Sequence, residues 1–293
     1  MDGLPDSPRQ DLVRVYNAFQ VVGFISNFVI VFIATLSRRV RRTLVWYLFM
    51  HGWILWCISH FLIIEYQTER RPPFGLCLVQ AGFIYAGPPC MALLTLGVLA
   101  QLYSAMYASI RQQRPPSWIN PLVIASPLAI FVLVFLEVIA VQTRSGEMKA
   151  AMYCNISDPM VVLISTVLDG LTCLAMLILE VLVFLMMYRH WSTYKRISTF
   201  PGSVMSGTMA YRISFFSFLP MVALGFSLQA TISNVSSSES HIVIASLPIA
   251  AALIFGTQKD IVYSCMFWRK DRPLSKDHTL LALIRREQSV SEV

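Results

Sequence analysis

The chain has 293 residues, of which 56% are hydrophobic and only 13% are charged, and its formal net charge is +7. A soluble globular domain carries about 25% charged residues, so this composition argues against an ordinary soluble enzyme or binding domain. The mean hydropathy of +0.62 likewise indicates that lipid is the main solvent of the chain.

Seven apolar runs follow one another, each long enough to cross roughly 30 Å of hydrocarbon as a helix. Helices are required because an unpaired backbone amide in lipid costs several kcal/mol. Residues 1–14 lack the basic region and cleavage site of a signal peptide, so we expect the first helix to be retained. The sequence predicts an all-α, polytopic membrane protein, a seven-transmembrane helix bundle with spans at about 15–36, 44–64, 77–107, 119–141, 159–188, 211–232 and 242–264.

Lysine and arginine residues are distributed unequally between the two faces of this predicted bundle. Of the 23 Lys and Arg residues, 17 fall on one face and six on the other. Loops rich in Lys and Arg stay in the cytoplasm. We therefore predict that the N-terminus (1–14) is extracellular, that the tail (265–293) is cytoplasmic, and that the protein is a multi-pass protein of the plasma membrane.

Glycan acceptors and cysteines fit this orientation. Asn155 and Asn234 are the two of five asparagines that begin an Asn-X-Ser/Thr triplet, and both fall in predicted outer loops, where glycosylation occurs. Of the six cysteines, only Cys77 and Cys154 lie at the oxidising outer surface. A disulfide between them would stabilise the protein by about 4 kcal/mol; the alternative is two unrelated free thiols.

The predicted topology and the positions of these cysteines resemble those of G-protein-coupled receptors. In the first span, "GFISNFVIV" is similar to the Asn-centred pattern of these receptors, with Asn27 in the Asn position. In the sixth span, "SFLP" resembles their aromatic-X-Pro motif, with Phe218 as the aromatic residue and Pro220 as the proline. The resemblance implies a signalling receptor in which Asn27, Phe218 and Pro220 take part in a conformational switch.

Several receptor motifs are absent. The third span ends in "AQLYSAMY", without the acidic-Arg-Tyr triplet, the last span has no Asn-Pro-x-x-Tyr, and the second span lacks its usual Asp. The segments "PPFGLC", "QAGFIYAGPPC" and "FGTQKDI" resemble orphan seven-helix receptors of basidiomycete fungi, which are loosely similar to fungal glucose- and cyclic-AMP-receptor-like proteins.

Two carboxylates in the predicted fifth span are candidate functional residues. Carboxylates within membrane helices cost roughly 2.5–3.5 kcal/mol and therefore usually face the interior of a bundle. Asp169 and Glu180 are eleven residues apart, which places them on one helix face and about 16 Å apart. We predict that Asp169 lines a ligand pocket and that Glu180 belongs to a switch. The alternative is two protonated acids that are hydrogen-bonded to neighbouring helices.

The third inner loop and the tail are the predicted contacts with intracellular partners and with lipid. Arg189, Lys195, Arg196 and Arg212 form a basic surface that we expect to contact a G protein, although they could merely enforce orientation. Pro220 permits a bend that would move this loop, or it could serve static packing. Cys265 precedes an aromatic and basic segment and is a candidate for palmitoylation.

Rival functions have less support. A retinal protein needs a lysine midway along the last helix, whereas Lys259 lies at its inner end. A zinc hydrolase needs several ligands at one depth, whereas His190, His241 and His278 fall in loops or at a helix end. A transporter of a small molecule is the alternative function, although no internal repeat is visible. We expect no enzymatic activity, cofactor, metal or nucleic-acid partner, but a small-molecule ligand, a heterotrimeric G protein and membrane lipid.

Overall fold

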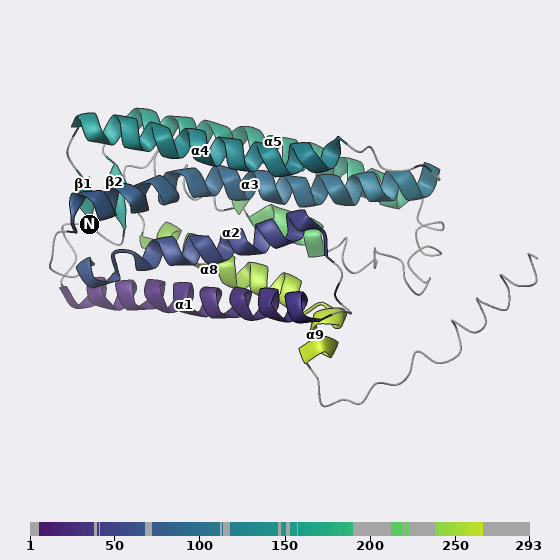
Figure 1. The fold of residues 1–293 in the computed structure, drawn as a ribbon, viewed down its shortest axis with the longest axis horizontal. Coiled ribbons are helices and arrows are strands. Elements are labelled where there is room, and N and C mark those ends of the chain that lie inside the picture. The colour runs from purple at the N-terminus through teal and green to yellow at the C-terminus, as the bar shows by residue number, and fades with distance from the viewer. Residues whose placement is uncertain are drawn as a thin grey trace, which may run out of the picture.

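The structure is a computed structural model in which the helices run nearly side by side (Figure 1). It describes residues 6–37, 40, 42–67, 72–111, 113, 118–145, 148–150, 153–156, 158–189, 212–219, 221–222, 225 and 238–265. The elements are α1 (Asp6–Leu36), α2 (Leu44–Phe61), the 3-10 helix η1 (Ile64–Tyr66), α3 (Phe74–Arg111), α4 (Ile119–Ser145), β1 (Met148–Ala150), β2 (Cys154–Ile156), α5 (Pro159–Arg189), α8 (Ser238–Gly256) and α9 (Lys259–Cys265). Residues 212–219 are also helical.

The protein is a helical membrane protein with several spanning helices. Five of the described helices, α1 to α5, are long and apolar enough to cross a bilayer, and α8 contributes a shorter apolar segment, Ile242–Gly256. Of the predicted sixth span, 211–232, the structure describes the helical residues 212–219, two further residues and Gly225, whereas Pro220 lies outside the described residues.

The seventh predicted span differs from the structure. The sequence predicts one helix over 242–264, but α8 ends at Gly256 and α9 begins at Lys259. The Arg212 guanidinium donates to the Ile254 carbonyl at 3.1 Å and to Thr257 Oγ1 at 2.9 Å. A side chain from the preceding helix therefore satisfies a carbonyl at the end of α8, which allows the chain to turn there.

The two ends of the bundle carry different structures. At the hairpin end, the antiparallel strands β1 and β2 lie beside the start of α3 (Figure 1). At the α9 end, α9 lies against the end of α1 (Figure 1). Helix α5 begins at the hairpin end with Asp158 as its N-cap, because Asp158 Oδ1 accepts from the Met160 amide at 2.8 Å, and Pro159 occupies the first helical position, where its missing N–H costs nothing.

Helix α3 is the centre of the bundle and packs against α2, α4 and α5, while α1 packs against α2 and α8. Small residues permit these close approaches, as is usual between membrane helices. A Cβ added to Gly23 of α1 would lie 2.7 Å from Pro248 Cβ of α8. One added to Gly87 of α3 would lie 2.4 Å from the Trp56 ring of α2. Large apolar side chains cover the outward faces, as contact with lipid requires: Phe28, Phe32, Leu133, Leu171 and Phe184.

Candidate functional site

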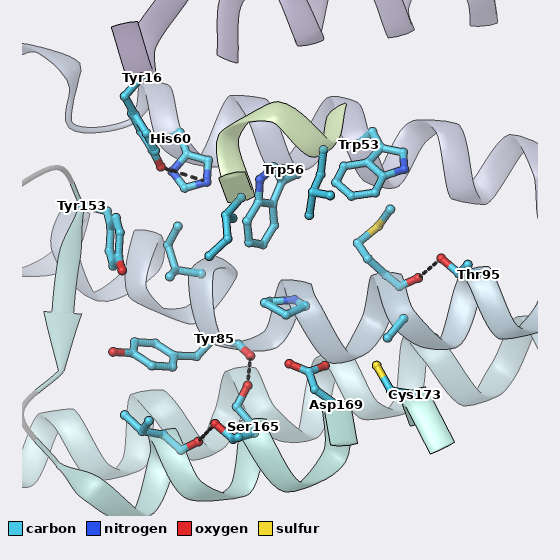
Figure 2. Close-up of a pocket in the computed structure, with 18 residues that line it drawn as sticks. Tyr16, Trp53, Trp56, His60, Tyr85, Thr95, Tyr153, Ser165, Asp169 and Cys173 are labelled. Carbon is cyan, nitrogen blue, oxygen red and sulfur yellow. Dashed lines mark hydrogen bonds between the residues drawn. The ribbon is translucent and has the colours of Figure 1, made fainter. Parts of the chain in front are cut away.

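A cavity of about 220 Å³ lies between the helices toward the hairpin end. This volume is below the roughly 300–1,000 Å³ of sites for drug-sized ligands, so it suits a smaller molecule. Its walls come from α1, α2, α3, α5 and α8 together with the loop that carries Tyr153 (Figure 2). The aromatic lining residues are Tyr16, Trp53, Trp56, His60, Tyr85 and Tyr153, and the polar ones include Thr95, Ser165, Thr166, Asp169 and Cys173.

Two prolines in α3 shape one wall of the cavity. Pro88 and Pro89 have no N–H, so the carbonyls of Ile84 and Tyr85, four residues earlier, lose their helical donors. Ser165 Oγ of α5 donates to the Tyr85 carbonyl at 2.9 Å (Figure 2). A side chain of α5 thus replaces the missing hydrogen bond and joins α3 to α5 at the cavity.

The disulfide predicted from the sequence holds the hairpin over this region. Cys77 of α3 is bonded to Cys154 of β2. Gln80, one turn after Cys77, accepts from the Cys154 amide at 2.9 Å and donates to the Ser59 carbonyl of α2 at 3.0 Å. The hairpin is therefore fixed to both α2 and α3, and Tyr153, which precedes Cys154, lines the cavity. Burial, and secondarily the nearby Tyr85 phenol, raise the pKa of Tyr153, so its phenol stays neutral.

A buried pair closes the cavity between α1 and α2. Tyr16 Oη and His60 Nδ1 are joined by a hydrogen bond of 2.6 Å (Figure 2). The His60 ring also contacts Trp56 edge-on, with centroids 5.1 Å apart, and Tyr153, with centroids 6.4 Å apart. His51, the other histidine of α2, is exposed. Nine residues, or about 900° of helix rotation, separate the two histidines, so they lie on opposite faces of α2.

Asp169 points toward the cavity from α5, as Figure 2 shows. Its Oδ1 atom is buried and accepts no hydrogen bond from any described residue. The prediction that Asp169 faces a pocket thus agrees with its position, and none of the described residues that line the cavity is a Lys or Arg.

Glu180 is also in the bundle interior, but it has a partner. Its Oε1 atom is hydrogen-bonded to Ser217 Oγ in the helical segment 212–219. Ser217 Oγ also donates to the Ser214 carbonyl at 2.8 Å. One hydroxyl proton cannot serve two acceptors, so both hydrogen bonds form together only when Glu180 carries a proton and donates to Ser217. This contact joins α5 to the following helix.

The aromatic residue that faces the bundle from the helical segment 212–219 is Phe216. Its side chain is only 1% exposed, whereas Phe218, the residue expected from the sequence, is 49% exposed. The Phe216 ring packs edge-on against Phe49, Trp53 and Phe255, with centroid distances of 5.3, 6.2 and 5.4 Å. The position of Phe218 therefore does not favour its expected role in a switch.

Asn27 joins α1 to α8. Its Nδ2 group donates to the Gly23 carbonyl at 2.7 Å and to the Pro248 carbonyl at 2.8 Å. Asn27 is fully buried, so this contact lies within the core of the bundle. The structure shows a helix-joining position for Asn27, and its role in a switch stays a prediction.

Arginine side chains tie the α9 end together. Arg212 is bonded to the end of α8, as described above. The Arg42 guanidinium donates to Gln258 Oε1, between α8 and α9, and lies 5.6 Å from the centroid of the Trp46 ring. Ser37 and Ser264 share a hydrogen bond of 2.9 Å between α1 and α9. Arg212, predicted as a G-protein contact, therefore has an internal role in the structure.

The remaining predicted sites are described only in part. Arg189 is exposed at the end of α5. Asn155 lies in β2 opposite Lys149 of β1, and Cys265 is the last residue of α9, but their side chains are not described. Asn234, Lys195, Arg196 and Pro220 lie outside the described residues.

Sequence reasoning missed most of the cavity lining. It identified Asp169 but not Tyr16, Trp53, Trp56, Tyr85 or Tyr153. Tyrosine and tryptophan within a span gave a signal, because a buried O–H or indole N–H normally needs a partner, but that signal does not say which helix faces which. The adjacent position of Tyr153 and Cys154 was the most specific clue.

No group of three or more His, Cys, Asp or Glu side chains is arranged to hold a metal ion in the part of the chain that the structure describes. No protein-family model matches the chain, and no curated protein matches its sequence. The geometry of the cavity and of the two bundle ends is therefore the basis for assigning a function.

Proposed function

We propose that the chain is a seven-helix signalling receptor of the G-protein-coupled kind, which binds a small extracellular ligand in the cavity beneath the hairpin. The observation that carries this proposal is the cavity itself: it lies under a disulfide-held hairpin and contains Asp169, whose buried Oδ1 has no hydrogen-bond partner among the described residues. Apolar pockets with a few convergent polar groups are the usual sites of small ligands.

Packed aromatic rings connect the cavity to the middle of the bundle. Trp53 lines the cavity and also contacts Phe49 and Phe216. Phe216 in turn contacts Phe255 of α8. A ligand that moves Trp53 would therefore also displace Phe216 in the helical segment 212–219 and Phe255 in α8. Coupling between distant sites is carried by packed side chains that have two alternative arrangements.

The proposed orientation places the hairpin end outside the cell and the α9 end in the cytoplasm. The unequal distribution of Lys and Arg supports it, and so does the disulfide at the hairpin end, because disulfides persist in oxidising compartments. The plasma membrane, glycans on Asn155 and Asn234, and a heterotrimeric G protein at the inner face belong to the same proposal.

The decisive experiment measures nucleotide exchange. The full chain, purified in lipid nanodiscs, is screened against small molecules by thermal shift, and each ligand that binds is tested for stimulation of nucleotide exchange on a panel of heterotrimeric G proteins. We expect stimulation by wild-type protein and none by Asp169→Asn, with Glu137→Gln as the control, since Glu137 lies in α4 and does not line the cavity.

A ligand that binds but stimulates no G protein in the panel would contradict the receptor function. The same preparation in sealed vesicles then tests the transporter alternative, because a transporter would accumulate the radiolabelled ligand inside. Uptake by wild-type protein together with no exchange would assign the cavity to transport.

A further inference from the structure

We propose that the cavity binds a small organic cation, an amine or a quaternary ammonium compound, with Asp169 as the counter-charge. This inference deepens the proposed function and depends on it only for the biological role of the ligand. The binding itself is a property of the cavity.

The first step concerns charge. Among the described residues that line the cavity, Asp169 is the one acid and there is no Lys or Arg. An unpaired carboxylate in an apolar interior is costly and is retained mainly where it has a role. Since the lining residues bring no cation to Asp169, the positive charge that balances an ionised carboxylate has to arrive with the ligand.

The second step concerns the hydroxyl groups near Asp169. Ser165 Oγ donates to the Tyr85 carbonyl at 2.9 Å, and Thr166 Oγ1 donates to the Val162 carbonyl at 2.7 Å. A hydroxyl has a single proton, so both groups turn only lone pairs toward the cavity. Together with the carboxylate they form a set of acceptors, which complements the N–H groups of an ammonium ion.

The third step concerns the aromatic walls. Trp53, Trp56 and Tyr85 line the same cavity, and Figure 2 shows the indole nitrogen of Trp56 on the side of its ring away from Asp169. The Trp56 ring therefore turns carbon atoms toward Asp169, and both indole N–H groups are buried. Aromatic faces attract organic cations, tryptophan most strongly.

The test compares cations with neutral compounds of the same shape on the full wild-type chain in nanodiscs. The first pair is choline and 3,3-dimethyl-1-butanol, in which carbon replaces the charged nitrogen. The second is 2-phenylethylammonium and 2-phenylethanol. We expect at least one cation to bind about tenfold or more tightly than its neutral counterpart, by titration calorimetry. For 2-phenylethylammonium the reason is a hydrogen bond between charged groups, and for choline, whose nitrogen has no N–H, it is the attraction of the charge to Asp169 and to the aromatic faces.

The variants then assign the preference to a residue. Asp169→Asn should weaken cation binding roughly 10–100-fold and abolish the preference over the neutral compound, whereas Glu137→Gln removes an acid outside the cavity and should leave both unchanged. Trp56→Leu should weaken binding of choline about threefold or more.

Equal binding of the two members of each pair, a preference that persists in Asp169→Asn, or no binding by either cation at millimolar concentration would overturn the proposal. The wild-type comparison needs no variant, so it decides even if Asp169→Asn fails to fold. A neutral ligand that drives nucleotide exchange would leave the receptor function intact and refute the cation. Selective cation binding without nucleotide exchange would support the cation and contradict the receptor function.

Discussion

The hairpin half and the α9 half of the bundle each contain one acid of α5 that faces the interior, and the surroundings of the two acids differ. Asp169 in the hairpin half faces a cavity, and its buried Oδ1 has no hydrogen-bond partner among the described residues. Glu180 in the α9 half is bonded to Ser217 of the neighbouring helix. The comparison indicates that one acid is available to a ligand while the other joins two helices.

The packing of the two halves differs in the same way. In the α9 half the interior is filled by a cluster of packed rings, in which Phe49, Phe216 and Phe255 all contact one another. Around Asp169 the rings of Trp56 and Tyr85 line open volume. A packed half that responds to changes in an open half is the arrangement that a receptor needs, because close-packed interiors change between discrete states.

The largest expected effect comes from removing the Cys77–Cys154 disulfide, which holds the hairpin over the cavity. Cys154→Ser opens a disulfide whose cysteines are 77 residues apart, and the loss of this cross-link should cost about 4 kcal/mol. We expect a sharp fall in thermal stability and in surface expression, measured on purified protein and by surface labelling. Cys90→Ser, in the helix that carries Cys77, is the control, because Cys90 is free. Equal stability of the two variants would contradict the role of the disulfide.

The next effect tests the packed half. Phe216→Ala should destabilise the protein by about 3 kcal/mol, since it leaves a void in the ring cluster, whereas Phe218→Ala should change stability by less than about 0.5 kcal/mol. Thermal unfolding of both variants in the same detergent measures the difference. A larger loss of stability in Phe218→Ala than in Phe216→Ala would contradict the orientation of the helical segment 212–219, in which Phe216 faces the interior of the bundle.

These two phenylalanines also show what the sequence could and could not predict. Residues two apart on a helix differ by about 200° in direction, so a motif that fits either of them depends on the rotation of the helix. Rotation is set by contacts with other helices, here Phe49 and Phe255, which no local pattern contains. The motif near Pro220 pointed to Phe218 as the inward-facing aromatic residue, whereas the buried one is Phe216.

Features that depend on local composition were easier to predict. The apolar runs of α2 to α5 gave helices close to their predicted bounds, because an unpaired backbone amide in lipid is costly. Helix α1 ends as predicted but begins at Asp6, before the predicted start at 15. The Cys77–Cys154 pairing followed from topology alone. The break at Thr257 and Gln258 did not, because Arg212, which bonds to the end of α8 there, lies 42 residues from Ile254.

The smallest effects on stability are expected for substitutions of the basic residues between α5 and α8. These substitutions also test most directly whether the protein contacts a G protein. Arg212→Gln loses the hydrogen bonds to Ile254 and Thr257, and it should cost about 1 kcal/mol because the end of α8 loses a donor. Lys195→Gln with Arg196→Gln should leave stability and insertion unchanged, since ample positive charge remains on that face.

The two sets of variants separate the roles of the basic residues when nucleotide exchange is measured with a bound ligand. If Lys195 and Arg196 contact a G protein, their neutralisation should weaken exchange several-fold at full thermal stability. The loss should shrink as ionic strength rises, because salt already screens these surface contacts in the wild-type protein. For Arg212→Gln we expect thermal stability and exchange to fall together, since Arg212 is bonded within the bundle. Unchanged exchange in the double variant would mean that Lys195 and Arg196 serve only to orient the chain in the membrane, and the G-protein surface would then have to be sought at the exposed Arg189 and the ends of α3 and α9.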